Sequence, residues 1–125
     1  MDEVDRDGYS KEVASLADRL AGADAENAVW DVYAETEKLI AILKFRMDYE
    51  TPGVFAKLPD ASDPAKLLKD ARKLLSKAAE EISKGRLVES IGTLRKARNE
   101  LRGYLIEKRK SVIKSRGTPR SELSA

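Results

Sequence analysis

The chain has 125 residues and a formal net charge of +2 at pH 7, and it contains neither cysteine nor histidine. It therefore lacks the residues for disulfides, zinc ribbons, iron–sulfur sites, thiol nucleophiles and histidine general bases, which excludes most hydrolase templates. A chain of this length buries about two thirds of its unfolded surface, so it has enough material for one hydrophobic core.

Charged residues make up 37% of the chain, so its outer faces must be densely ionic. The longest apolar run, 39–43, is far shorter than the roughly 20 residues that a membrane-spanning helix needs. The first residues are acidic and do not resemble a signal peptide. We therefore expect a cytoplasmic protein without a membrane partner.

Hydrophobic periodicity predicts four helices and no strand. The first is expected over 10–21, with Ser10 as its N-cap, and it is expected to be short and peripheral. Asp24 is expected to cap a long second helix over 25–49. Pro52 ends this helix because the residue before a proline is disfavoured in the α region.

The connection over 51–63 is the only long irregular stretch that the sequence predicts within the bundle. It contains three apolar residues, Val54, Phe55 and Leu58. The favoured interpretation is that these side chains cover one end of the bundle. The alternative is a loop that binds a partner.

The third helix is predicted over 64–83, because an acidic N-cap followed by proline is a strong helix start at Asp63-Pro64. Its apolar residues recur at steps of three and four, and lysines occupy the opposite face. Beyond Ile82 the apolar phase shifts by about half a turn. A tight antiparallel hairpin at Gly85 therefore leads into a fourth helix over 87–113.

Two glycines, Gly92 and Gly103, lie within this fourth helix. Each costs about 1 kcal/mol relative to alanine in a helix interior. Such glycines permit close approach of another helix or a kink.

The stretch from Ala78 to Ile91 resembles the turn of a tetratricopeptide-type hairpin, and the similarity continues into Ala97 and Leu101. It covers about a quarter of the chain, and no second 34-residue repeat follows. Ser90 stands where that family usually has alanine. The resemblance implies a helical hairpin with a close crossing, a pattern that unrelated helical proteins share.

The predicted fold class is therefore all-α, a mostly antiparallel four-helix bundle with a long second helix and a helical hairpin over 64–113. Residues 1–114 are expected to form a single domain. Residues 115–125 are expected to form a flexible, disordered basic tail.

Carboxylates are the only acids and bases available in number. Asp31 and Glu35 share a helical face, and Glu80 and Glu81 are adjacent. Paired carboxylates can hold Mg²⁺, so a magnesium-dependent hydrolase is one hypothesis. Because lysines lie beside these acids, a solvated ionic face is the favoured interpretation. No metal site and no cofactor are predicted.

Charge is unevenly distributed along the chain. Residues 1–62 contain 14 acidic and 7 basic side chains, and residues 63–125 contain 17 basic and 8 acidic ones. Helical spacing places five arginines on one stripe of the fourth helix and tail. They are Arg95, Arg98, Arg102, Arg109 and Arg116.

An arginine stripe suits phosphate because guanidinium offers two parallel donors. We expect no exposed aromatic side chains beside it, so any nucleic-acid contact would be independent of base sequence. Alternatively, the basic half matches the acidic half within one bundle, across a dimer, or against an acidic protein.

These observations rank three functions. The first is a non-enzymatic interaction or scaffolding domain that binds a protein partner or itself. The second is a nucleic-acid-binding accessory protein that uses the fourth helix and tail. The third is the carboxylate-dependent magnesium hydrolase.

Overall fold

The computed structural model of the chain describes residues 2–22, 24–47 and 63–115, the last five of them for the backbone only. These residues form four α-helices without any strand, as the sequence predicts. The helices are α1 (Glu3–Arg19), α2 (Ala25–Arg46), α3 (Pro64–Ser83) and α4 (Leu87–Ser115). No helix in these ranges is both long and apolar enough to cross a membrane.

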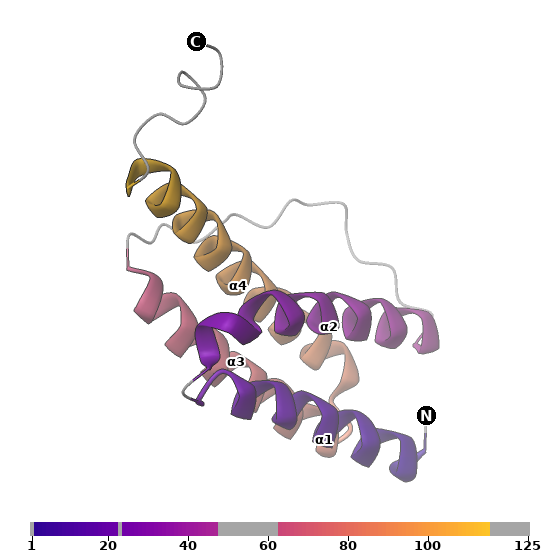
Figure 1. Cartoon of the computed structure of the whole chain (residues 1–125). Coiled ribbons are helices and arrows are strands. Elements are labelled where there is room, and N and C mark those ends of the chain that lie inside the picture. The colour runs from indigo at the N-terminus through magenta and orange to yellow at the C-terminus, as the bar shows by residue number, and fades with distance from the viewer. Residues whose placement is uncertain (1, 23, 48–62, 116–125) are drawn as a thin grey trace.

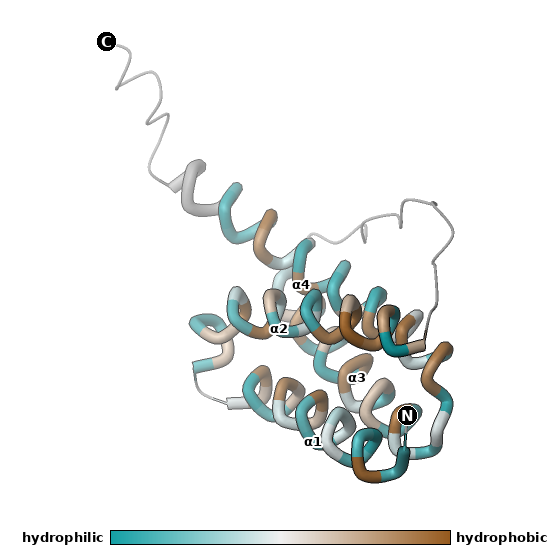
Figure 2. The backbone as a smooth tube through the Cα atoms, turned by 90° about the vertical axis from the view of Figure 1, so that its right-hand side faces the viewer, coloured by the Kyte–Doolittle hydropathy of each residue, from teal (hydrophilic) through white to brown (hydrophobic). Residues whose placement is uncertain are grey.

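The four helices form two antiparallel hairpins, one laid on the other (Figure 1). The α3–α4 contact is the most extensive, α1 packs on α3, and α2 packs on α4. The α1–α2 contact is lighter, although the two helices run side by side (Figure 2). The fold is thus a mostly antiparallel four-helix bundle whose centre is the α3–α4 hairpin.

One cluster of buried side chains forms the core, and every helix contributes to it. The α3 stripe is buried along its length, with Leu75 and Ile82 completely inaccessible. Full burial of one such side chain contributes roughly 1.5–3 kcal/mol. Tyr104 of α4 is buried as well.

Local signals set the boundaries of α3. The Asp63 carboxylate accepts a hydrogen bond from the Ala65 amide at 3.0 Å. At the other end, Gly85 has φ +78° and the Arg86 amide donates to the Glu81 carbonyl at 2.8 Å. This closure satisfies carbonyls that the helix end leaves unpaired. The predicted hairpin is therefore confirmed.

The first helix is longer and more central than predicted. It begins at Glu3 because the Asp2 side chain accepts from the Asp5 amide at 2.9 Å. Ser10 is not an N-cap, since its hydroxyl donates to the Ala79 carbonyl of α3 at 2.8 Å. The sequence prediction of a short, peripheral helix was wrong because Ser10 caps no helix and instead joins two of them.

The α1–α2 hairpin is joined by an ion pair toward each end. Arg19 lies 3.6 Å from Asp31. Arg46 donates to Tyr9 at 3.2 Å and to Asp5 at 2.9 Å, and these contacts, Tyr9 first, raise the pKa of Arg46. The C-terminal end of α2, at Arg46, therefore lies against the first turns of α1.

Two details of the helices differ from expectation. Asp24 precedes α2 but makes no side-chain cap hydrogen bond. Gly92 has open space around it, so it does not serve a close helix approach. The expectations for residues 51–62 and for the tail beyond Ser115 lie outside the described residues.

Candidate functional site

The predicted arginine stripe runs along α4, but its members have different surroundings. Arg98 is largely buried and its Nε lies 3.0 Å from Glu37 of α2. Its side chain retains 22% of its exposure, against 43% for Glu37. Arg98 therefore neutralises an acidic residue of its own bundle, and a ligand phosphate would have to compete with that carboxylate.

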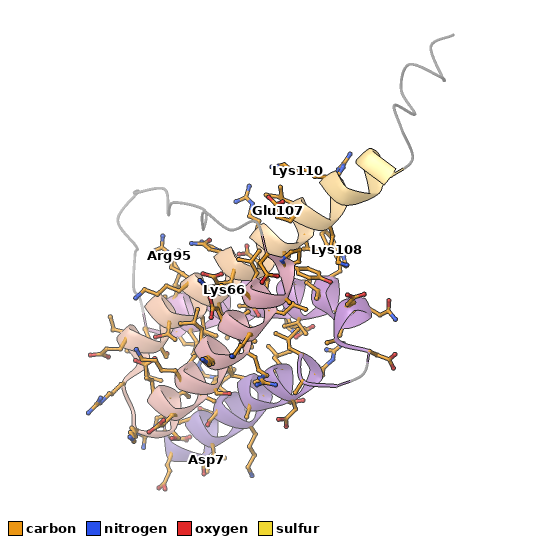
Figure 3. All side chains as sticks on the ribbon, turned by 90° about the vertical axis from the view of Figure 1, so that its left-hand side faces the viewer. Asp7, Lys66, Arg95, Glu107, Lys108 and Lys110 are labelled. Atoms are coloured by element: carbon orange, nitrogen blue, oxygen red, sulfur yellow. The ribbon has the colours of Figure 1, made fainter. Side chains whose placement is uncertain are left out.

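Three other stripe members remain available. Arg102 and Arg109 are exposed and Arg95 is half-buried. None of the three side chains has a hydrogen bond or ion pair with another described residue. In Figure 3 the Arg95 side chain projects outward from α4. Arg116, the fifth member, lies outside the described residues.

A second ion pair joins the C-terminal part of α4 to the first turn of α2. Lys108 donates to Glu26 at 3.3 Å, and its ammonium lies 5.8 Å from the centre of the Tyr104 ring. The Glu26 hydrogen bond is the main cause of a raised Lys108 pKa. Acidic side chains from the first half of the chain thus form ion pairs with basic side chains from its second half.

The outward side of α2 carries the largest exposed aromatic residues of the described chain. Trp30 is 64% exposed and Phe45 is 87% exposed. Ala34 and Ala41 lie between them and are exposed as well. At 100° per residue these four side chains fall within about 60° of one another. We call Trp30, Ala34, Ala41 and Phe45 the α2 outer face.

The exposed aromatic residues Trp30 and Phe45 lie on α2 and not on α4, the helix that carries the arginine stripe. The Glu37–Arg98 and Glu26–Lys108 pairs fix the antiparallel register of α2 against α4. Trp30 lies between those two acids on α2, in ring contact with Tyr33 at 5.9 Å. It therefore lies on the stretch of α2 that runs alongside residues 98–108 of α4.

The carboxylates singled out in the sequence are each engaged by a neighbouring residue. Glu35 lies 3.8 Å from Lys38, and Glu80 lies 2.6 Å from Lys84, which lowers the pKa of Glu80. Glu81 accepts from the Thr93 hydroxyl at 2.5 Å. Asp31 pairs with Arg19 across an open groove between α1 and α2.

No group of three or more acidic side chains within the described ranges has the geometry to hold a metal ion. The buried hydroxyls are also engaged locally. Thr36 donates to the Val32 carbonyl at 2.7 Å and Ser90 to the Leu87 carbonyl at 2.6 Å. Within the described residues, neither hydroxyl is oriented by a general base.

No protein-family model matches the chain, and neither a curated protein nor a solved structure shows significant similarity to it. Two surfaces of the described residues are candidate sites, the α2 outer face and the three available arginines of α4.

Proposed function

We propose that this protein is a non-enzymatic helical interaction domain and that the α2 outer face is its docking surface. One observation carries the proposal: Trp30 and Phe45 are 64% and 87% exposed on the same stripe of a 22-residue helix. Tryptophan is among the residues that most often dominate the binding energy of protein interfaces.

Single exposed apolar side chains are common on protein surfaces, but a line of them along one helix is a recognised mark of an interaction site. The two alanines between the aromatics support this assignment. Small side chains let a partner helix approach closely, while Trp30 and Phe45 supply large contact areas at either end.

A site-specific crosslinking experiment tests this proposal. A photoreactive amino acid replaces Ala41 in the full chain, in cells that make the protein naturally, and adducts are identified by mass spectrometry. We expect an adduct that disappears when Trp30→Glu is added.

The matched control is the same photoreactive residue at Ala14, an exposed alanine of α1. Adducts of equal yield at both positions, or at neither, would contradict a docking role for the α2 outer face. An adduct specific to Ala41 supports the role, whatever the mass of the partner.

A second candidate function is supported by the available arginines. Arg95, Arg102 and Arg109 offer guanidinium groups without a protein partner among the described residues. Arginine favours phosphate, and the exposed Trp30 ring provides a surface on which a base can stack. We therefore retain nucleic-acid backbone binding as the alternative.

Fluorescence anisotropy with short duplex DNA and single-stranded RNA tests the alternative. Three phosphate contacts predict a slope of roughly −3 for log K against log salt on duplex DNA. Arg102→Glu with Arg109→Glu should abolish binding, whereas Lys77→Glu on α3, also exposed, should leave most of it. Absence of binding at low salt would remove this candidate.

A further inference from the structure

The α2 outer face has an internal symmetry in its sequence positions. Trp30 and Phe45 are equally far from the point between Glu37 and Lys38. Ala34 and Ala41 are also equally far from that point, at half the distance or less. The face is therefore palindromic, with large side chains at its ends and small ones near its middle.

Such an arrangement is compatible with pairing about a two-fold axis. When two copies of a helix pair antiparallel about such an axis, each residue faces the one equally far on the other side of the axis. Trp30 of one copy then faces Phe45 of the other, and Ala34 faces Ala41. Aromatic thus meets aromatic at both ends, and alanine meets alanine where the helices approach most closely.

One flank of the face carries Glu37, which already pairs with Arg98 of its own chain, and the other flank carries a pair of opposite charges. Glu35 and Lys38 form this pair, and their charged atoms are 3.8 Å apart within the chain. Their side chains are 39% and 60% exposed, so both can turn toward a neighbour. In the antiparallel pair the matching flanks meet, so the two Lys38 side chains lie near the axis and each is within reach of Glu35 of the other copy.

We propose that the occupant of the α2 outer face is a second copy of this chain, paired antiparallel about a two-fold axis between Glu37 and Lys38. The inference rests on the proposed docking role of this face and adds the identity of the partner. A single pair of helices buries an area at the low end of specific interfaces. The dimer is therefore weak and its population rises with protein concentration.

Sedimentation equilibrium of the full chain over a wide concentration range measures the dimer directly. We expect Ala41→Glu to raise the dissociation constant by about 30-fold or more, because it places a charge at the centre of an apolar contact. Ala14→Glu on α1 introduces the same charge on an exposed helix surface and should leave the dissociation constant unchanged. Circular dichroism establishes that both variants keep their helical content.

Disulfide trapping tests the register and the direction of the pairing. The natural chain has no cysteine, so each engineered thiol is the only one. A mixture of Ala34→Cys and Ala41→Cys chains should oxidise mainly to the mixed dimer. Two Ala34→Cys chains should crosslink poorly, because their thiols lie about 10 Å apart along the axis, at 1.5 Å per residue over seven positions.

The outcomes separate the two proposals. A concentration-dependent dimer with the mixed disulfide supports antiparallel self-pairing. A dimer that prefers the disulfide between two Ala34→Cys chains overturns this geometry, since it indicates parallel pairing. A chain that stays monomeric overturns self-pairing, and the docking role of the face then depends on whether crosslinking at Ala41 finds a different protein.

Discussion

α2 and α3 have similar lengths but distribute their apolar side chains differently. On α3 the large buried residues Leu67, Leu75 and Ile82 share one stripe, and the opposite face is polar. On α2, Leu39 and Leu43 are completely buried, whereas Trp30 and Phe45 lie on the opposite side in solvent. The core of this chain accounts for the apolar residues of α3 but for only half of those on α2.

This difference separates stability from interaction. A residue such as Leu75 is explained by what it contacts within the chain. Trp30 contacts Tyr33 at the edge of its own helix and leaves most of its surface in water. An apolar face that the fold does not use is therefore the feature of this molecule that most needs a partner.

The largest expected effect is the difference in stability between truncating one apolar side chain on α3 and truncating one on α2. Leu75→Ala should destabilise the chain by about 2–5 kcal/mol, because it opens a cavity at a fully buried position. Phe45→Ala should change the free energy of unfolding of the monomer by less than about 0.5 kcal/mol. Urea denaturation at low protein concentration measures both, and equal losses would show that Phe45 is part of the core.

The next effect concerns two glycines of the α3–α4 hairpin. Gly85→Ala should destabilise by about 1–2 kcal/mol because φ is positive there, and its new Cβ would also lie 2.5 Å from an Arg6 nitrogen. Gly92→Ala meets open space in a helix interior and should stabilise by up to about 1 kcal/mol. Thermal unfolding should move the two midpoints in opposite directions, and a shift in the same direction would contradict this assignment.

The sequence predicts the α3–α4 hairpin well because its signals are local. Asp63-Pro64 and Gly85 specify their own backbone conformations, so the ends of α3 agree with the structure to the residue. The start of α1 was missed, since Asp2 precedes no apolar repeat and the more conventional N-cap, Ser10, lies within the helix. The only local signal for the start of α1 was the acidic residue Asp2, whose side chain accepts from the amide of Asp5, three residues later.

The candidate surfaces depend on how helices dock, which periodicity does not provide. α2 carries apolar residues on more than one side, and its packing on α4 decides which side remains exposed. The pairing of Arg98 with Glu37 likewise requires the register between two helices distant in sequence. Helical spacing alone could not separate Arg98 from Arg102.

A smaller effect is expected at the contact between α1 and α3. Ser10→Ala removes a hydrogen bond between α1 and α3, which the Ser10 hydroxyl donates to the Ala79 carbonyl in a partly buried site. The expected loss is about 1 kcal/mol in the free energy of unfolding. The exposed Ser15→Ala on the same helix is the matched control, and equal effects would show that the Ser10 contact contributes nothing specific.

The smallest effect is a pH dependence at Glu100 of α4. Burial, and secondly the charge of Asp70 on α3, raise the pKa of Glu100, while Lys66 opposes the shift. The folded state therefore binds the Glu100 proton more tightly than the unfolded state does. The stability of the chain falls as pH rises from the unfolded-state pKa of Glu100 through its higher folded-state pKa. Glu100→Gln should stabilise the chain near neutral pH.

That gain should vanish well below the ordinary glutamate pKa of about 4.3, where Glu100 is protonated in both states. Denaturation of the variant and the natural chain at several pH values measures the difference. A gain that is constant with pH would contradict an electrostatic cause.

Self-pairing of the α2 outer face can be followed directly by fluorescence, because Trp30 is the only tryptophan of the chain. Its fluorescence emission can be recorded as protein concentration is raised, in the natural chain and in Ala41→Glu. Self-pairing predicts a blue shift and weaker acrylamide quenching as the concentration of the natural chain rises, and neither change in the variant. Emission and quenching that stay those of an exposed tryptophan at every concentration would contradict it.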